Sequence, residues 1–206
     1  MGAIIKTADE IQKMRVAGKL AAEVLNMIGE HVVKGVTTDE LNQLCHNYIV
    51  DVQAGIPAPL NYGHPPFPKS ICTSVNHVIC HGIPSDKKLK DGDIVNIDVT
   101  VIKDGYHGDS SKMFVVGKPS IMAERLIRVT QECLYKAIEI VKPGTTLGDI
   151  GHVIQHAAIE HLCNLKIDHH ILGDISFSED KKEFNISSFK EGFSNNIVSN
   201  YHGILD

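Results

Sequence analysis

Residues 95–110 read VNIDVTVIKDGYHGDS, two segments joined by the dipeptide Asp104-Gly105. The first segment is rich in β-branched residues, which favour strands. Asp-Gly tolerates the positive φ angles that a two-residue hairpin turn requires. The sequence therefore predicts an antiparallel hairpin with strands over Asp93–Ile102 and Tyr106–Val116.

The length of the turn sets the register of this hairpin. With a two-residue turn, Lys103 faces Tyr106 and Thr100 faces Asp109. Alternate residues on a strand share one face, so Asp98 and Asp109 then lie diagonally on the same face. A three-residue turn would slip the register and put the two carboxylates on opposite faces. Asp-Gly favours the two-residue form.

Two carboxylates on one face suit a hard divalent cation or a pair of ions. Asp98 interrupts an apolar strand, where burying an unpaired charge is costly. The alternative is an ordinary wet face with surface aspartates, because Val99 and Val101 point the other way. The hairpin by itself leaves both interpretations open.

The sequence around the hairpin predicts helices and one long loop. Thr7 with Glu10, and Thr37 with Glu40, have the spacing of capping boxes that start helices. Proline and glycine are frequent in residues 53–69, which is typical of an irregular functional loop. The expected elements are helices over about 7–29, 37–52 and 120–141, and one or two strands over Ser70–His81.

An internal echo indicates a duplicated plan. Gly35, Thr37, Glu40 and Leu41 match Gly144, Thr146, Asp149 and Ile150 at a constant offset. The simpler alternative is that Gly-x-Thr-x-x-acid is a common way to link two helices. A second copy would need strands after its short helix, but the pattern is lost from about Leu162. We therefore expect the sheet to keep an uncovered edge, which favours aggregation.

Composition excludes several classes of protein. A formal net charge of −5 gives no reason to expect nucleic acid or an anionic membrane as partner. No apolar run has the roughly 18 to 20 residues that a membrane span needs, and no secretory signal is recognisable. The odd count of 5 cysteines, with no Cys-x-x-Cys pair, suits reduced thiols in the cytoplasm. Nothing in the sequence argues for an oligomer, so a monomer is expected.

Histidines supply further candidates. His81 ends an apolar run and is either a catalytic or substrate-contacting imidazole or a structural one. His152 and His156 have the i, i+4 spacing of helical metal ligands, but no Glu follows His152 as the zincin pattern requires. His169-His170 lies in the irregular tail and carries little weight.

Five segments together resemble type I (bacterial-type) methionine aminopeptidases over about residues 3–160. They are Ile5–Thr7, Met14–Gly18, Cys80–Pro84, Lys90–Val99 and His107–Asp109. The resemblance implies the duplicated pita-bread fold of class α/β (α+β), an antiparallel sheet with flanking helices. It also implies a dinuclear metal-dependent hydrolase that removes the initiator methionine from nascent polypeptides. Its cofactors would be two divalent ions, of Co, Mn, Fe or Zn.

The resemblance also implies roles for single residues. Asp98 and Asp109 resemble two of the family's five metal-binding side chains, with Asp109 bridging both ions. His81 resembles the active-site histidine that contacts the substrate amide. Tyr62 and Cys72 resemble residues that line the methionine side-chain pocket.

The chain departs from the family after about residue 160. The family's metal-binding histidine in a Gly-His-Gly context, its Ile-Glu-Pro glutamate, its second glutamate and its second substrate histidine have no match there. We therefore expect residues 1–161 to form an incomplete pita-bread domain and residues 162–206 a poorly ordered tail. The chain is expected to be impaired or inactive. The alternative is a non-catalytic remnant that binds a partner such as the ribosome.

Overall fold

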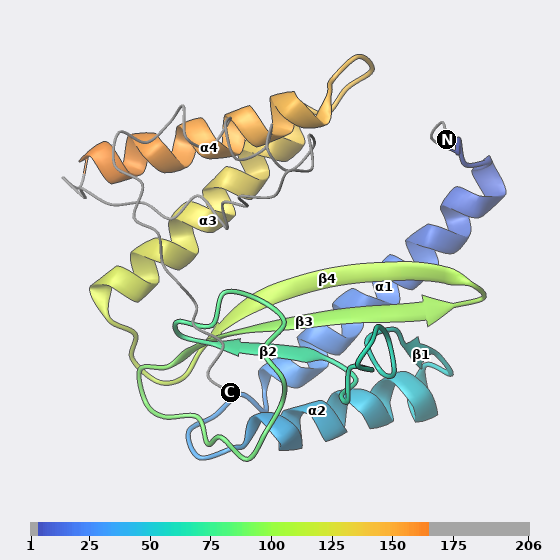
Figure 1. The fold of residues 1–206 in the computed structure, drawn as a ribbon, viewed down its shortest axis with the longest axis vertical. Coiled ribbons are helices and arrows are strands. Elements are labelled where there is room, and N and C mark those ends of the chain that lie inside the picture. The colour runs from blue at the N-terminus through green and yellow to red at the C-terminus, as the bar shows by residue number, and fades with distance from the viewer. Residues whose placement is uncertain (1–3, 165–206) are drawn as a thin grey trace. The chain divides into compact units, whose positions relative to one another are not determined.

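A computed structural model describes residues 4–164 of the 206-residue chain (Figure 1). Its helices are α1 (Ala8–Gly29), α2 (Thr38–Asn47), a π-helical turn η1 (Tyr48–Val52), α3 (Ile121–Glu139) and α4 (Leu147–Asn164). Its strands are β1 (Ile56–Pro57), β2 (Cys72–Val75), β3 (Ile94–Lys103) and β4 (Tyr106–Val115). Residues 165–206 of the predicted tail, with His169-His170, lie outside the described residues, and residues 162–164 belong to the end of α4.

The central hairpin is formed by β3 and β4 in the predicted register. Lys103 is paired with Tyr106, and Thr100 with Asp109. Asp104 and Gly105 have φ angles of 52° and 80°, as a two-residue turn of this type requires. Prediction of the turn and its register from Asp104-Gly105 is therefore confirmed.

The antiparallel sheet is completed by two short strands that also pair with β3. Cys72 of β2 lies opposite Asp98, and Ile56 of β1 lies opposite Ile102. The strand predicted over Ser70–His81 ends early, at Val75. Asn76 turns the chain with a φ of 55°, and its side chain accepts a hydrogen bond from the Ile94 backbone and donates one to Asp93. Within residues 53–69, which were predicted to form an irregular loop, β1 is the one element of regular secondary structure.

Both predicted capping boxes are present. The Thr7 and Thr37 side chains accept hydrogen bonds from the backbone N–H of Glu10 and Glu40. Each glutamate in turn accepts from the threonine backbone N–H at 2.7 Å. The second predicted helix is correct in position, but its last turn widens into the π-helical η1.

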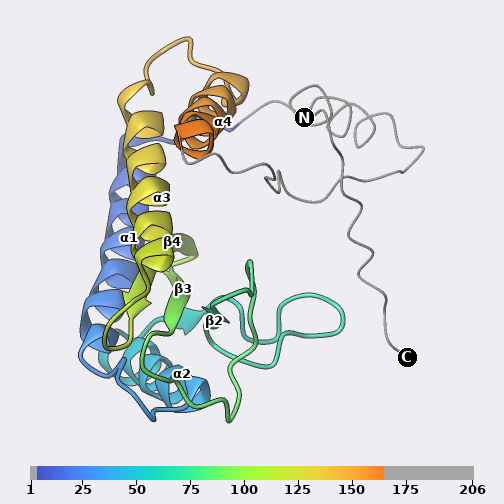
Figure 2. The same cartoon turned by 90° about the vertical axis from the view of Figure 1, so that its left-hand side faces the viewer.

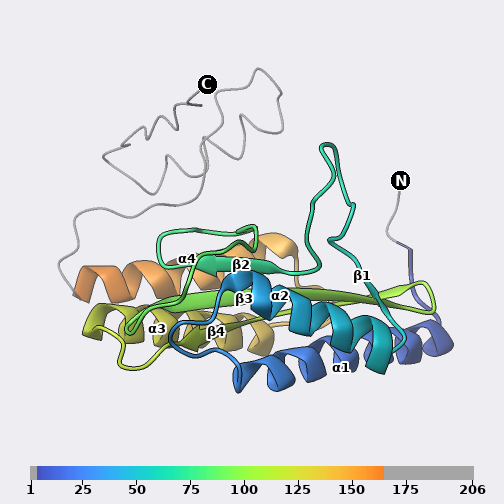
Figure 3. The same ribbon diagram turned by 90° about the horizontal axis from the view of Figure 1, so that it is seen from below.

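The apolar core lies between one face of the sheet and helices α1 and α2. Ile97, Val99 and Val101 of β3 are fully buried, with Ala21 of α1 and Leu41 of α2 in the same cluster. Figures 2 and 3 show α1 and α2 on one side of the sheet and the loop that joins β1 to β2 projecting from the other. Alternation along β3 consequently turns Asp98 to the face away from the core.

The chain divides into two compact units between Ile127 and Arg128, within α3. In the second unit, His161 of α4 contacts Glu132 of α3 at 3.1 Å. Gly144 has a φ of 95°, close to the 92° of Gly35, and the Thr146 side chain accepts from the Asp149 backbone N–H as Thr37 does from Glu40. The predicted echo is therefore reproduced in local geometry. None of the helices between residues 4 and 164 is long and apolar enough to cross a membrane.

Candidate functional site

Asp98 and Asp109 come together on the sheet face that points away from the core. Asp98 lies opposite Ser111, one diagonal step from the pair formed by Thr100 and Asp109. Burial raises the pKa of Asp98, and the neighbouring Asp109 carboxylate raises it further by its charge and by a hydrogen bond. Asp98 is half-buried and Asp109 is exposed. The hairpin thus holds two carboxylates close enough to share a cation.

Thr100 adds an oxygen to this pair. Its hydroxyl donates a hydrogen bond of 2.9 Å to Oδ1 of Asp109. The sequence analysis did not single out Thr100 as part of the site. The signal was available, because the predicted register already placed Thr100 directly opposite Asp109.

Cys72 reaches the carboxylates from the neighbouring strand. It is paired with Asp98 across the sheet and is only 7% exposed. Burial, followed by the negative charge of Asp98, raises the pKa of the Cys72 thiol to about 11. Cys72 is therefore a neutral, mainly apolar group beside the carboxylates. Four described cysteines are free thiols: Cys45, Cys72, Cys80 and Cys133.

His81 is brought to the same place by a segment that returns along β2. The Thr73 backbone N–H donates to the Gly82 carbonyl at 2.7 Å, and the Gly82 N–H donates to the Ser74 hydroxyl at 3.2 Å. His81 has a φ of 53° and is exposed. Its charge acts on the pKa of Asp98, lowering it against the effects of burial and Asp109.

Gly108 determines how closely α1 supports this site. A Cβ atom at Gly108 would overlap the carbonyl group of Ala17 and the backbone nitrogen of Gly18. The residue next to Asp109 therefore has to be glycine for α1 to pack this tightly against β4. The backbone that carries Asp109 is held by a helix as well as by β3.

Tyr62, His152 and His156 are the remaining candidates from the sequence. Tyr62 is 78% exposed in the loop between β1 and β2. His152 and His156 lie on one side of α4, in the second unit, with ring centroids 6.0 Å apart and planes tilted by 45°, and they line a hollow with Glu160.

The donor set at the carboxylate pair fits only part of a metal site. Carboxylate oxygens are suitable ligands for hard divalent cations. Among residues 4–164, however, no group of three or more His, Cys, Asp or Glu side chains is arranged to hold an ion. The two aspartates can contribute to a metal site but cannot complete one from the described residues alone.

Comparison with known proteins identifies the family of the chain. The sequence model of metallopeptidase family M24 matches residues 12–193. The chain belongs to metallopeptidase family M24. It is 62% identical over 156 residues to the methionine aminopeptidase of Escherichia coli K12, and 60% identical over 157 residues to that of Rickettsia prowazekii. These matches cover 75% and 76% of the chain.

Solved structures of M24 proteins share the fold. The crystal structure of Rickettsia prowazekii methionine aminopeptidase matches 78% of the chain with a TM-score of 0.75 and 58% identity. The prolidase of Pyrococcus furiosus, at 23% identity and a TM-score of 0.66, supports the fold alone. The predicted pita-bread arrangement, an antiparallel sheet with flanking helices, is thus confirmed. The chain spans 58–60% of the length of the curated relatives above and 63% of the Rickettsia structure.

Proposed function

We propose that this chain carries the first part of a methionine aminopeptidase site, which removes the N-terminal methionine from nascent polypeptides. The supporting observation is the meeting of Asp98 and Asp109 with His81 and Cys72 on one face of the sheet. The high identity to methionine aminopeptidases adds the substrate class. A cytoplasmic monomer is the expected form.

We assign roles to the four residues and to Tyr62 within this proposal. Asp98 and Asp109 would hold divalent metal, which in this class of enzyme polarises the scissile carbonyl group as a Lewis acid. His81 would donate or accept a hydrogen bond at the substrate amide. Cys72, neutral and buried, would form part of the wall of the pocket for the methionine side chain, and Tyr62 would line the same pocket.

The number and kind of ions belong to the same proposal. Two ions, of Co, Mn, Fe or Zn, need more ligands than the two aspartates provide. Residues 4–164 contain no third ligand placed beside them. We therefore expect the 206-residue chain to bind metal weakly and to be impaired or inactive as a peptidase. We propose a boundary between domain and tail near residue 161; the M24 match continues beyond it to residue 193.

A metal titration and a peptidase assay test the proposal together. We expect weak binding of Mn²⁺ or Co²⁺ by calorimetry, abolished when Asp98 and Asp109 are both changed to Ala. We expect no measurable release of methionine from a Met-Ala-Ser peptide at saturating metal, because several groups that act together are missing. The double variant also controls for contaminating host enzyme.

The outcomes separate the parts of the proposal. Metal binding that persists unchanged in the double variant would refute the assigned ligands. Methionine release that disappears in the double variant would show an active enzyme and contradict the expected impairment. The alternative function, a non-catalytic remnant that binds a partner such as the ribosome, is favoured by the incomplete ligand set among the described residues. Co-sedimentation with ribosomes in the absence of metal tests it.

A further inference from the structure

Helix α2 presents two parallel stripes of side chains. Leu41 and Cys45 of α2 and Ile49 of η1 follow one another at intervals of four residues and are fully buried in the core. Thr38, Asn42 and His46 have the same spacing and form a second stripe, here called the polar stripe. On a surface helix such a stripe usually faces water. Thr38 and Asn42 are instead only 2% and 7% exposed.

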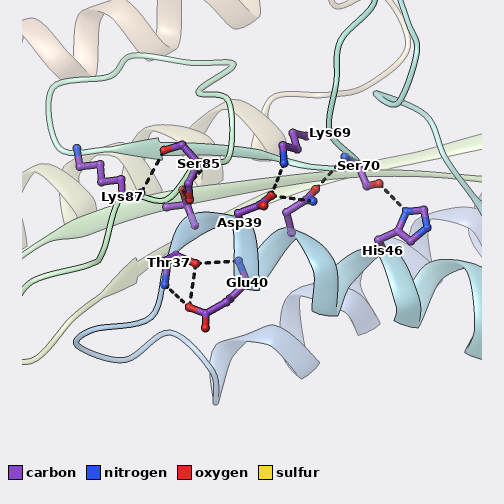
Figure 4. Close-up of polar contacts among 10 residues, drawn as sticks. Thr37, Asp39, Glu40, His46, Lys69, Ser70, Ser85 and Lys87 are labelled. Atoms are coloured by element: carbon purple, nitrogen blue, oxygen red, sulfur yellow. Dashed lines mark hydrogen bonds and ion pairs between the residues drawn. The ribbon is translucent and has the colours of Figure 1, made fainter.

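The carboxyl-terminal part of the polar stripe binds the segment that leads into β2. Asn42 Oδ1 accepts a hydrogen bond of 2.9 Å from the Ser70 backbone N–H. His46 Nδ1 lies 2.7 Å from the Ser70 hydroxyl, and Lys69 forms an ion pair with Asp39 (Figure 4). Ser70 is only 2% exposed, so these bonds satisfy polar groups that water does not reach.

The amino-terminal part of the stripe binds the segment that follows His81. The Thr38 hydroxyl donates to the Ser85 carbonyl at 3.1 Å, and the same oxygen lies 2.9 Å from the Ser85 backbone N–H. Backbone N–H groups in the first turn of α2 add bonds from Thr38 to Lys87 and from Asp39 to Ser85. These N–H groups have no partner within the helix itself.

One helix therefore anchors two segments that approach the carboxylates separately. Ser70 lies two residues before Cys72, and Ser85 lies four residues after His81. We propose that the polar stripe of α2 is a positioning device that holds Cys72 and His81 beside Asp98. The interpretation of Cys72 and His81 as substrate-binding residues rests on the proposed function. The anchoring itself is a property of the chain that can be measured without metal or substrate.

The reactivity of two buried cysteines provides the measurement. Cys72 follows the anchored segment, whereas Cys45 belongs to the neighbouring apolar stripe of the same helix and is fully buried in the core. Cys72 is 7% exposed and Cys45 is fully buried, so each thiol reacts mainly when its surroundings open. Global unfolding exposes both, while release of the Ser70 segment exposes Cys72 alone. The ratio of the two alkylation rates isolates local release.

The experiment follows alkylation of the full chain by N-ethylmaleimide with peptide mass spectrometry, in EDTA. In Asn42→Ala and Ser70→Ala, we expect the Cys72:Cys45 rate ratio to rise at least about fivefold, as loss of a buried hydrogen bond would cause. Thr37→Ala removes the capping box of the same helix, and Gln43→Ala removes an exposed bond to Asn47. Neither control should raise the ratio, because a fall in global stability exposes both cysteines.

A second variant tests the His81 side. Thr38→Val keeps the volume of the side chain but removes its bonds with Ser85, and should speed amide hydrogen exchange in residues 80–86 at least about fivefold relative to residues 94–103. An unchanged cysteine ratio in both Asn42→Ala and Ser70→Ala, or a parallel rise at Cys45, would overturn the proposal. Equal acceleration of amide exchange in residues 80–86 and residues 94–103 of Thr38→Val would overturn the proposal that the polar stripe positions His81. Because no metal or peptide is used, these results are independent of the peptidase assay.

Discussion

The charged form of Asp98 lowers the stability of the folded protein. Burial and the adjacent Asp109 carboxylate both raise its pKa, which means that both disfavour its charged form. The folded state therefore binds a proton at Asp98 more tightly than the unfolded state does. The contribution of Asp98 to the free energy of unfolding should therefore be largest at low pH. It should decline as the pH rises from the ordinary aspartate range through the raised pKa.

Asp98→Asn should for this reason stabilise the metal-free protein at pH 7. We expect a rise in melting temperature of about 2–4 °C, the change that about 1 kcal/mol produces in a chain of this size. The gain should shrink near pH 3.5, where Asp98 is protonated. Thermal unfolding in EDTA measures it, with Asp104→Asn in the exposed turn as a control for charge. A fall in melting temperature at pH 7 would contradict the argument.

At the scale of elements, the contact between α1 and β4 depends on Gly108. A methyl group at this position would collide with the backbone of Ala17 and Gly18. By contrast, a methyl group at Gly18 of the same helix would meet no atom within 4 Å. The two glycines offer a matched comparison between a packed and an open position.

Gly108→Ala should destabilise the protein by about 2 kcal/mol or more, as overpacking a tight contact does. Gly18→Ala should instead stabilise it by about 0.5–1 kcal/mol, because alanine favours the helix. Urea unfolding of both variants measures the difference. Similar effects from the two substitutions would show that the α1–β4 contact is not tight at Gly108.

At the scale of the whole molecule, one edge of β4 has no strand partner among the described residues. Among residues 4–164, its sole strand partner is β3. In a hairpin with a two-residue turn the flanking pair, here Lys103 and Tyr106, is a hydrogen-bonded pair. By alternation the N–H of Ser110 is then expected to face β3 and that of Ser111 to face outward. Large apolar side chains are exposed in the second unit as well, among them Leu134, Tyr135 and Ile138. Both features favour association.

We therefore expect a poorly soluble or partly molten protein, with a broad thermal transition. Ser111→Pro should slow aggregation, measured by light scattering, because it removes an outward donor without breaking the β3–β4 ladder. Ser110→Pro, which removes an inward donor, should destabilise the hairpin instead. A soluble monomer with sharp, cooperative unfolding would contradict the expectation, as would equal aggregation of the parent and Ser111→Pro.

Local sequence determined the features whose partners lie close along the chain. Asp104-Gly105 set the turn, and the turn set the register that unites Asp98 with Asp109. Thr37 and Glu40, three residues apart, started α2 in the same way. These interactions depend on short-range geometry, which a single segment of sequence can specify. The early end of β2 and the π-helical turn η1 were not visible in the same patterns.

Tertiary structure decided the features whose partners lie far apart. Asn42 and Ser70 are 28 residues apart, and Thr38 and Ser85 are 47 apart. No periodicity in the sequence indicates that this side of α2 faces two loops rather than water, because polar residues suit either environment. The placement of Cys72 and His81 beside Asp98 follows from these long-range bonds and from the packing of the sheet. Sequence supplied the carboxylate pair, and the assembled fold supplied its surroundings.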